Sequence, residues 1–428
     1  MKTIKMKYGT EVLDVFVQEK NLLGKIESNG MKKNKTEEEV IVDALAQPID
    51  SGRLKDIVKP GEKICIIISD ITRAWQKMSR YLPYIVEELN QGGIKDEDVV
   101  FLCATGTHRK QTKEEHTILL GEQLAQRFEV IDHDCRHKDS LVYIGETSYK
   151  TPVIINKMAL DCDHIIVTGA VVFHDLAGWG GGRKSILPGI SAYESIMANH
   201  ALALNKNIGE GIHPGVRCGN GINNPIHQDM VEAANLVKPS YIFNVIMDDN
   251  GDIVKAVAGD YRKAHEIGQQ LVEEIDGVAI KDKADLVIAS AGGYPKDINL
   301  YQASKALSNA KEAVNNEGII ILLSQCIEGI GDPDVQEIIE CYKSNIDREC
   351  SIREHFTVAR YIGYMIAEIA SRIQIILVSD IEPDLLEKIN IQVVKTVEEA
   401  LDIAYTKKGK DLKTYVMPYA ANTLPKVK

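Results

Sequence analysis

Residues 63–73 read Lys-Ile-Cys-Ile-Ile-Ile-Ser-Asp-Ile-Thr-Arg, an apolar run of strand length that ends in polar and charged side chains. Such a run, rich in β-branched residues, is typical of a strand buried on both faces of a parallel sheet. Similar runs, separated by amphipathic stretches, lie farther along the chain at 99–104, 165–168, 284–290, 318–323 and 373–379. The alternation predicts an α/β protein with mostly parallel sheets.

The length of the chain, 428 residues, indicates more than one hydrophobic core. The strand and helix pattern restarts near 275–283, so we expect two α/β domains, at 1–275 and 276–428, with an active-site cleft between them. The first would carry most of the ligand-binding motifs, and the second would close the cleft. A last short strand, at 414–418, could pair with either domain.

Composition excludes several classes of protein. The formal net charge of −12 argues against a nucleic-acid-binding surface, which would be basic. The apolar runs are far shorter than the roughly 20 residues of a membrane-spanning helix. No apolar signal-peptide core occurs near the start, so we expect a cytoplasmic protein without a nucleic-acid or membrane partner. The eight cysteines form no CxxC pair, and Cys65 and Cys103 fall inside apolar runs, which favours reduced thiols packed in the core.

Polar motifs follow the carboxyl ends of the predicted strands, where open α/β sheets gather their ligands. Asp70 and Arg73 follow the first strand, and His108 follows the second. Arg73 suits a carboxylate or phosphate because its planar guanidinium binds two oxygens at once. The alternatives are an Asp70–Arg73 ion pair that orders the loop and a hydrogen-bonded structural role for His108.

The third strand runs into a glycine-rich stretch that precedes Arg183 and Lys184. Glycine lets a backbone turn tightly and approach a ligand closely. The stretch is not a Walker A motif, because the GxxxxGK[ST] spacing is absent. Lys184 could bind a phosphate, form a Schiff base or anchor a cofactor, and the alternative is a solvated lysine after a turn. The four glycines are Gly178, Gly180, Gly181 and Gly182.

Two histidines flank the lysine, since His174 lies ten residues before Lys184 and His200 sixteen residues after it. His174 and His108 offer two imidazoles able to exchange a proton near neutral pH, as a reaction on either face of a carbon centre requires. His200 either caps a helix end or binds a metal. No cluster of His, Cys and Asp with metal-ligand spacing surrounds it, so a metal cage made by the protein alone is not expected.

Two further motifs allow a structural or a functional interpretation. An Asn-Pro pair reads as a helix N-cap, and we favour a structural role for His227 and Asp229 just after it. In the second domain, Tyr301 and Lys305 share a helical face, and Gln302 lies beside them. These three could close over a ligand or form an exposed helix face. From the residues alone, we expect a cleft enzyme that handles an anionic substrate with two histidines, an arginine and two lysines.

Together, these motifs resemble the nickel-dependent lactate racemase family, in the family's order and across residues 69–305. So many motifs in order are far more specific than one glycine-rich loop. The resemblance implies two α/β domains, the first of which binds the cofactor and carries out catalysis. The motifs are Ser69-Asp-Ile-Thr-Arg, Ala104-Thr-Gly-Thr-His, Gly178-Trp-Gly-Gly-Gly-Arg-Lys-Ser-Ile-Leu-Pro-Gly, Met197-Ala-Asn-His, Asn224-Pro-Ile-His-Gln-Asp-Met, Gly292-Gly-Tyr-Pro and Tyr301-Gln-Ala-Ser-Lys.

The resemblance implies a nickel pincer nucleotide as cofactor, pyridinium-3-thioamide-5-thiocarboxylic acid mononucleotide with nickel, covalently bound to Lys184. His200 would be the only protein ligand of the nickel, and square-planar geometry is normal for nickel(II). His108 and His174 would be the paired acid and base. The other implied contacts are Arg73 and Lys305 at the substrate carboxylate and oxyanion with Tyr301 and Gln302 assisting, Asp70 at the ribose, Thr72 at the cofactor, and Gly178, Gly180, Gly181 and Gly182 at the phosphate.

The implied activity is that of a racemase or epimerase, which inverts the carbinol carbon of a 2-hydroxy acid by proton-coupled hydride transfer through a 2-keto acid. The implied partners are a small anionic 2-hydroxy acid and the enzymes that build the cofactor, and assembly as a homodimer is compatible with the sequence. Where lactate-specific members carry Pro-Val-Pro after the arginine, this chain has Ala74-Trp-Gln-Lys, and its loop contains Asp175 and Trp179. These departures make a larger 2-hydroxy acid, aromatic or sugar-derived, an alternative to lactate.

Two other functions fit the residues when the resemblance is set aside. One is a two-domain nucleotide- or phosphosugar-handling enzyme in which Lys184 is a phosphate ligand. The other is a binding or maturation partner without enzymatic activity, which would have little need for His108, His174 and Lys184 together.

Overall fold

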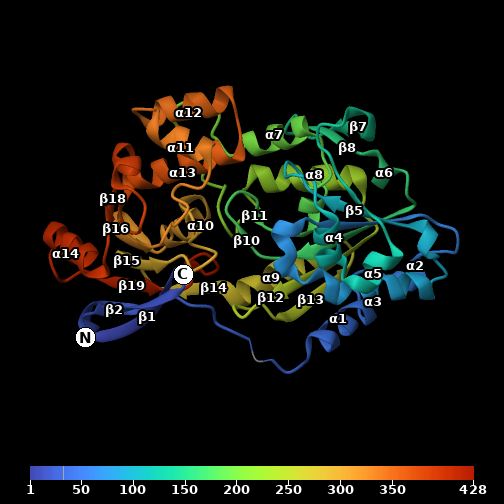
Figure 1. The fold of residues 1–428 in the computed structure, drawn as a ribbon, viewed down its shortest axis with the longest axis horizontal. Coiled ribbons are helices and arrows are strands. Elements are labelled where there is room, and N and C mark those ends of the chain that lie inside the picture. Colours follow the sequence, from blue (N-terminus) through green and yellow to red (C-terminus); the bar gives the residue numbers. More distant parts are fainter. Residues whose placement is uncertain (32) are drawn as a thin grey trace. The chain divides into compact units, whose positions relative to one another are not determined.

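The computed structural model describes residues 1–31 and 33–428, and the chain divides into two compact units (Figure 1). The predicted domains, 1–275 and 276–428, differ from these units, because two early segments of the chain belong to the second unit. The predicted cleft between the domains stays a prediction. The first unit comprises Gly30–Leu202 and Gly215–Ile275, and the second comprises Met1–Asn29, Ala203–Pro214 and Asp276–Lys428.

The first unit is built on a six-stranded sheet with the order β13-β12-β9-β4-β5-β6 (Figure 1). Neighbouring strands run parallel, except that β12 and β13 are antiparallel. The apolar run that opened the sequence analysis forms central β4, with a neighbour on either side. The strands are β4 (Ile64–Ser69), β5 (Val99–Ala104), β6 (Val130–Asp132), β9 (His164–Ala170), β12 (Tyr241–Met247) and β13 (Ile253–Gly259).

The described part of this unit contains nine α-helices, and those between consecutive parallel strands provide the connections that parallel pairing requires. The nine are α1 (Glu37–Ala46), α2 (Leu54–Ile57), α3 (Met78–Gln91), α4 (Lys113–Leu120), α5 (Glu122–Arg127), α6 (Lys157–Leu160), α7 (Tyr193–Ala201), α8 (Pro225–Val237) and α9 (Lys263–Asp276). Short 3-10 helices and two hairpins complete the unit: η2 (Ile71–Gln76), η3 (Asp96–Asp98), η4 (Lys138–Ser140), η5 (Gly182–Ser185), β7 (Leu141–Glu146) with β8 (Pro152–Asn156), and β10 (Phe173–His174) with β11 (Gly178–Trp179).

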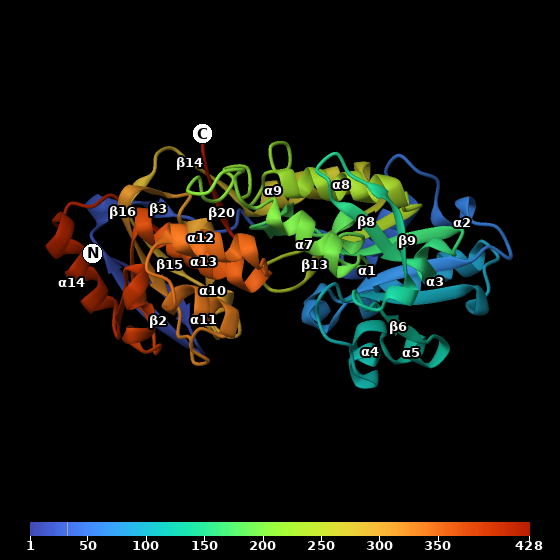
Figure 2. The same ribbon diagram turned by 90° about the horizontal axis from the view of Figure 1, so that it is seen from above.

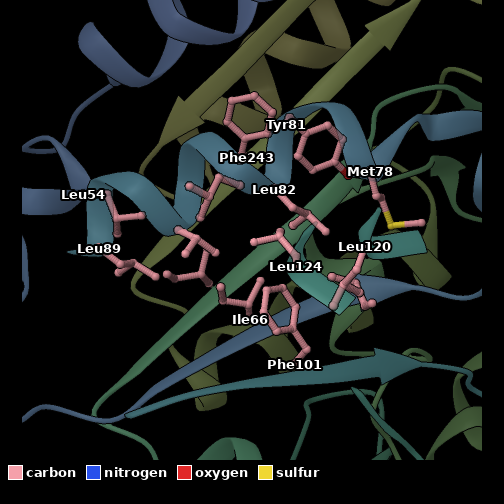
Figure 3. Close-up of a cluster of buried hydrophobic side chains, with 14 of the residues drawn as sticks. Leu54, Ile66, Met78, Tyr81, Leu82, Leu89, Phe101, Leu120, Leu124 and Phe243 are labelled. Atoms are coloured by element: carbon pink, nitrogen blue, oxygen red, sulfur yellow. The ribbon is translucent and has the colours of Figure 1, made fainter. Parts of the chain in front are cut away.

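The core of the first unit lies between α3 and the sheet (Figure 3). α3 buries Tyr81, Leu82, Ile85 and Leu89, whose spacing of three and four residues places them on one helical face. The ring of Tyr81 packs against Phe243 of β12, with the centroids 5.0 Å apart. Burying a side chain of this kind contributes about 1.5–3 kcal/mol. This apolar layer therefore fixes the sheet whose strand ends carry the polar motifs.

The second unit contains another six-stranded sheet, in the order β18-β17-β16-β15-β19-β3, and all its paired strands run parallel (Figure 2). β3 comes from the N-terminal segment and pairs with β19, which explains why residues 1–29 belong to this unit. β19 is the strand predicted at 414–418, and it lies in this sheet rather than in the first. The strands are β3 (Leu22–Lys25), β15 (Ala284–Ser290), β16 (Val314–Leu323), β17 (Gln374–Val378), β18 (Ile391–Val394) and β19 (Thr414–Met417).

Two small sheets and a set of helices complete the second unit. The small sheets pair β1 (Lys2–Tyr8) with β2 (Glu11–Val17) and β14 (Gly277–Ile280) with β20 (Leu424–Val427). The helices are η1 (Glu19–Asn21), α10 (Leu300–Ala310), α11 (Pro333–Glu340), α12 (Asn345–Glu354), α13 (Val358–Arg372), η6 (Pro383–Ile389) and α14 (Val397–Lys408).

The structure confirms the predicted fold class. β5 and β15 have the predicted bounds, whereas β9 and β16 extend beyond their predicted runs. Cys65 and Cys103 are buried in the core, as predicted. Across residues 1–31 and 33–428, no helix is both long enough and apolar enough to cross a membrane. A cytoplasmic location stays a prediction.

Candidate active site

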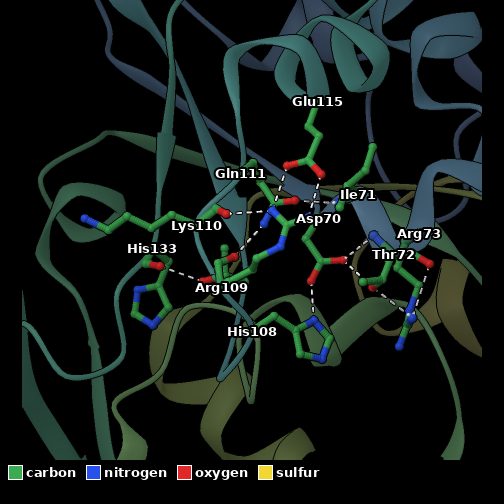
Figure 4. A network of polar contacts seen from close by, with 11 residues as sticks. Asp70, Ile71, Thr72, Arg73, His108, Arg109, Lys110, Gln111, Glu115 and His133 are labelled. Carbon is green, nitrogen blue, oxygen red and sulfur yellow. Dashed lines mark hydrogen bonds and ion pairs between the residues drawn. The ribbon is translucent and has the colours of Figure 1, made fainter. Parts of the chain in front are cut away.

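Two loops of the first unit, each at the carboxyl end of a parallel strand, bring Asp70 and His108 together (Figure 4). One Asp70 oxygen contacts Nδ1 of His108, and the other accepts from the Thr72 hydroxyl and, at 3.0 Å, from Thr72 N. Burial acts to raise the pKa of Asp70, but the hydrogen bonds from His108 and Thr72 outweigh it and lower that pKa. Because the ionised carboxylate binds Nδ1–H, Nε2 of the half-exposed His108 ring is the nitrogen that can exchange a proton with a substrate.

These contacts give Asp70 and Thr72 roles that the sequence did not predict. The resemblance places both at the cofactor, whereas in the structure they bond to each other and Asp70 orients His108. The contact of Asp70 with a ribose stays a prediction.

Gln111 fixes the two loops relative to each other (Figure 4). Its Oε1 accepts from Ile71 N at 3.0 Å, and its backbone N–H donates to Asp132 at 2.9 Å. The guanidinium of Arg109 donates to both carboxylate oxygens of Glu115, at 2.6 and 2.8 Å, so it is already engaged by an anion. The position of His108 thus depends on residues outside every predicted motif.

Arg73 lies in η2 and is exposed. Its Nη1 donates to Thr72 Oγ1 at 3.1 Å and approaches Thr72 O at 3.4 Å. In the described part of the chain no ion pair joins Arg73 to Asp70, so the alternative of a local pair is not realised. An exposed guanidinium at a strand end is suited to a carboxylate ligand.

The hairpin of β10 and β11 holds His174 beside Lys184. The rings of Phe173 and Trp179 pack together with centroids 4.9 Å apart, and Trp179 is 3% exposed, so this indole belongs to the hairpin core rather than to a substrate surface. His174 Nε2 lies 3.2 Å from Lys184 Nζ, and His174 Nδ1 lies 3.1 Å from Asp175 Oδ1. The two groups that the sequence placed ten residues apart are therefore in direct contact.

Burial disfavours the charged forms of both groups. Desolvation, with the charges of Arg183 and Arg73, lowers the pKa of Lys184 to about 7. Desolvation, with the charge of Lys184, lowers the pKa of His174 to about 4. Lys184 is partly buried, so the alternative of a solvated lysine does not hold. A lysine with an accessible neutral form near pH 7 is a nucleophile.

Arg183, which precedes Lys184, is buried and donates hydrogen bonds to backbone carbonyls of the glycine-rich loop. Its Nη2 donates to the carbonyls of Ala177 and Trp179 and to His227 Nδ1, each at 2.9 Å. Among the described residues no carboxylate forms an ion pair with it, and desolvation lowers the pKa of Arg183 to about 9. The Asp175 carboxylate is a negative charge that acts on Lys184, whereas Arg183 and Arg73 add positive charge. This excess of positive charge favours binding of an anion nearby.

Two of the loop glycines are required by close packing. Gly178 has φ +72°, and a Cβ there would lie 2.1 Å from Asn220 O. Gly181 has φ +69°, and a Cβ there would lie 2.5 Å from Asn244 Oδ1. A left-handed backbone and the absence of space each exclude other residues.

The remaining two glycines bear on the prediction that the loop backbone holds a phosphate. Gly180 N donates to Val172 O at 2.7 Å, and Gly182 N donates to Asn244 Oδ1 at 2.9 Å. These two N–H groups bond within the protein, and the binding of a phosphate by the loop stays a prediction. The absence of side chains at the loop glycines therefore lets the loop backbone pack closely against Val172 and Asn244.

His200 occupies the last turn of α7 and is 4% exposed. Its Nδ1 donates to Ile196 O at 2.9 Å, so Nε2 keeps its lone pair. Desolvation, with the charge of Lys184, lowers the pKa of His200 to about 3, which keeps the ring in the neutral form that binds metals.

A protein-only metal cage is absent from the described residues, which hold no group of three or more His, Cys, Asp or Glu able to bind a metal ion. His200 offers one neutral imidazole, and Lys184 is close enough for its charge to act on that ring. A single protein ligand suits a metal that receives its other ligands from a cofactor linked to the lysine. The residues present are therefore compatible with the cofactor that the resemblance implies.

The motif around His227 has the structural role favoured from the sequence. Asn224 caps α8, its side chain accepting from His227 N at 3.2 Å. His227 is buried against Arg183, and Asp229 is buried among hydroxyl and amide donors.

Three predicted residues lie in the second unit, on α10. Lys305 is exposed, and its Nζ donates to Gln302 Oε1 at 2.8 Å. Asn299 caps the helix by accepting from Gln302 N at 3.0 Å. Tyr301 is partly buried one helical turn before Lys305. The roles of Tyr301, Gln302 and Lys305 toward a substrate stay predictions.

No predicted motif gave a role to Arg183, Asn244 or His265, which shape the loop. An arginine inside a glycine-rich apolar run is a signal that could have drawn attention to Arg183. Asn244 and His265 are 62 and 82 residues from their partners in the loop, and nothing local in the sequence connects them to it.

The fold and the site define a class of protein: an α/β chain of two units, in which His174 contacts a partly buried lysine, Asp70 contacts His108, and His200 is buried in a neutral form. The family described as lactate racemase N-terminal domain matches residues 8–211, and the one described as lactate racemase C-terminal domain matches residues 279–423. The chain belongs to the lactate racemase family, whose members are isomerases.

Individual relatives agree over the full length of the chain. The lactate racemase of Lactiplantibacillus plantarum is 34% identical over 427 residues, which are 98% of each chain. That of Thermoanaerobacterium thermosaccharolyticum is 33% identical over 435 residues, with both chains fully covered. The solved lactate racemase apoprotein from the latter organism matches with a TM-score of 0.91 and 32% identity, covering 99% of this chain and 100% of that one. A protein from Thermotoga maritima, 17% identical with a TM-score of 0.64 and covering 93% of this chain and 99% of its own, shares the fold.

Proposed function

We propose that this protein is a 2-hydroxyacid racemase or epimerase that carries a nickel pincer nucleotide on Lys184. The observation that carries the proposal is the environment of Lys184, a partly buried amine whose pKa is lowered to about 7 by desolvation and by two arginines. Such an amine can form the thioamide bond that would link it to the cofactor. Relatives named lactate racemase make lactate the first substrate to test.

Two residues would hold the cofactor. Lys184 would bind it covalently, and His200 would offer Nε2 to the nickel because its Nδ1 is engaged by Ile196 O. When bound, this cofactor supplies the two-electron acceptor and donor that inversion through a 2-keto acid requires. The enzymes that build the cofactor are therefore expected partners.

His108 and His174 would move the hydroxyl proton, one for each enantiomer, because a planar 2-keto acid has two faces. Asp70 holds His108 with Nε2 outward, so this ring accepts or returns the proton at Nε2. A thioamide at Lys184 would remove the positive charge that, together with desolvation, lowers the pKa of His174.

Arg73 would hold the substrate carboxylate, with Lys305, Tyr301 and Gln302 assisting from the second unit. Trp75, two residues after Arg73, is 45% exposed and offers an apolar surface at the end of η2. This surface favours a 2-hydroxy acid with a side chain larger than the methyl group of lactate as an additional substrate.

Intact mass and metal analysis test the proposal. In protein produced together with the cofactor-building enzymes, we expect an added mass that maps to Lys184, and nickel in proportion to chain. The Lys184→Ala variant should lack both and racemise no 2-hydroxy acid above background. An unmodified Lys184 without nickel in the wild-type protein would contradict the proposal and favour the enzyme in which Lys184 binds phosphate.

A substrate panel then separates lactate from larger acids. Single enantiomers of lactate, 3-phenyllactate and a sugar-derived 2-hydroxy acid are incubated with the nickel-loaded protein and resolved by chiral chromatography. We expect racemisation or epimerisation of at least one acid, with the rates ranking the substrates.

A further inference from the structure

Asp229, on α8, is a carboxylate that is fully removed from solvent. It accepts from the hydroxyl of Thr147, from Thr151 Oγ1 at 2.8 Å and from Asn199 Nδ2 at 2.7 Å. Among the described residues it forms no ion pair with a cation, and its burial raises its pKa. Burying a carboxylate without a cation costs stability. We therefore infer that Asp229 serves to orient the side chains that donate hydrogen bonds to it.

Asn199 is the donor that matters for the site, because it directly precedes His200 in α7. It is fully buried, and its Nδ2 also approaches Ile226 O at 3.2 Å. Its Oδ1 has no hydrogen-bond partner. A flipped amide would place oxygen against the Asp229 carboxylate and against Ile226 O, and the shorter contact, with Asp229, contributes most to the orientation of this side chain.

The last turn of a helix is prone to fray, because its carbonyl groups lack partners within the helix. His200 lies in that turn, and two residues later, at Leu202, the chain leaves the first unit until Gly215. The contact of Asn199 with Asp229 ties this turn to α8. Without it, the turn would keep the longer contact of Asn199 Nδ2 with Ile226 O, the bond of His200 to Ile196 O, and packing.

We propose that Asp229 is a positioning residue that holds the last turn of α7 through Asn199, and so sets how firmly His200 retains a metal. The inference rests on the proposed function, in which His200 binds nickel. Residues that orient a metal ligand from behind typically change metal affinity by about 10- to 100-fold.

The chain provides a matched control on the same helix. Glu232 lies one turn after Asp229 and accepts from Ser148 N and Ser148 Oγ, each at 2.7 Å. Asp229 and Glu232 therefore both bind the turn between β7 and β8, but Asp229 also binds Asn199. A difference between Asp229→Asn and Glu232→Gln isolates the contact with α7.

The experiment has two readouts on the two variants and the wild type. The first is the rate at which the nickel-loaded protein loses nickel to a chelator. The second is amide hydrogen exchange of residues 196–202 in protein without cofactor. We expect Asp229→Asn to lose nickel about tenfold faster and to exchange faster in this segment, whereas Glu232→Gln matches the wild type in both.

Two results would overturn the inference: wild-type nickel loss and exchange in a folded Asp229→Asn protein, or equal effects in both variants. A lower Tm for Asp229→Asn with unchanged nickel loss would show a purely structural role. If Asp229→Asn does not fold, Asn199→Ser removes the amide and leaves the carboxylate with its two threonines, and the same faster loss is expected. Wild-type protein without nickel would contradict the proposed function, while the exchange readout would still test the positioning.

Discussion

Two buried arginines, one in each unit, both donate hydrogen bonds to backbone carbonyls but have different neighbours. Arg348 on α12 is 2% exposed, and Arg183 in the loop is 4% exposed. Neither pairs with a carboxylate among the described residues, and desolvation lowers the pKa of both. Each is stabilised instead by hydrogen bonds to neutral acceptors.

The acceptors differ. Arg348 donates to oxygen atoms, including the carbonyls of Ile338 at 2.9 Å and Ile339 at 3.2 Å near the end of α11. It therefore caps a helix, as cations do at carboxyl ends. Arg183 also donates to an imidazole, that of His227, and lies next to Lys184. Together with desolvation, its charge lowers the pKa of Lys184, so under the proposed function this buried arginine would also influence the reactive amine.

Replacing each arginine by methionine gives the largest expected effects. Either change leaves carbonyl groups without a donor, at about 1–3 kcal/mol each, so we expect both variants to lose about 3 kcal/mol of unfolding free energy. Folded Arg183→Met should also lose about a hundredfold in kcat, because small displacements of reacting groups have effects of that size. Folded Arg348→Met should keep its kcat. Urea unfolding measures the loss of stability, and kcat is measured on the nickel-loaded proteins. An equal loss of kcat in the two variants would contradict the idea that only Arg183 influences the reaction.

Acid should distinguish the two arginine sites. Desolvation, with the charge of Arg183, lowers the pKa of His227 from 6.5 to about 3 in the folded protein. A lowered histidine pKa contributes stability that is complete above pH 6.5 and is lost as the pH falls towards 3, by at most about 1.4 kcal/mol per pH unit. The contacts of Arg348 contain no imidazole. Between pH 7.5 and pH 5, protection from hydrogen exchange, corrected for the intrinsic rate at each pH, should therefore fall more in α8 than in α12, and His227→Gln should reduce the difference.

Unlike Arg183, which pairs with no carboxylate in the described part of the chain, His108 has a carboxylate partner, Asp70, and the effect of that carboxylate on activity can be measured. Asp70→Asn removes the carboxylate charge that faces Nδ1 of His108, and we expect kcat to fall by about tenfold or more, as for other partners that orient a histidine. Glu62→Gln is the control, since Glu62 binds His164 Nε2 at 2.9 Å in a pair outside the predicted motifs. Equal effects of the two variants on kcat would argue against an orienting role for Asp70.

The smallest effects concern the backbone of the loop. Gly181→Ala introduces a left-handed alanine that also contacts Asn244, whereas Gly251→Ala introduces one with φ +78° and open space. Left-handed strain costs about 1 kcal/mol or more, so Gly251→Ala should lose about 1 kcal/mol and Gly181→Ala clearly more. Thermal or urea unfolding measures the difference in stability between the two variants. Equal losses would contradict the prediction and show that the loop adjusts to the added methyl group.

Features with a local cause could be predicted from the sequence. The strand bounds 99–104 and 284–290 matched because an apolar run of strand length needs no distant partner to be recognised. The N-cap at Asn224 and the place of His200 in a last helical turn also follow from neighbouring residues. The family resemblance rested on such local motifs, and the comparisons confirm it.

Only the tertiary structure decided which motifs meet. Asp70 and His108 are 38 residues apart, and the register of β4 and β5 with the bond of Gln111 to Ile71 brings them together. The glycine loop was predicted to hold a phosphate by backbone N–H groups, but Asn244, from a strand 62 residues away, already accepts from Gly182 N. Periodicity and capping report interactions within a few residues, whereas the partners of a polar group depend on strand order and register. Those are set by the packing of the whole sheet.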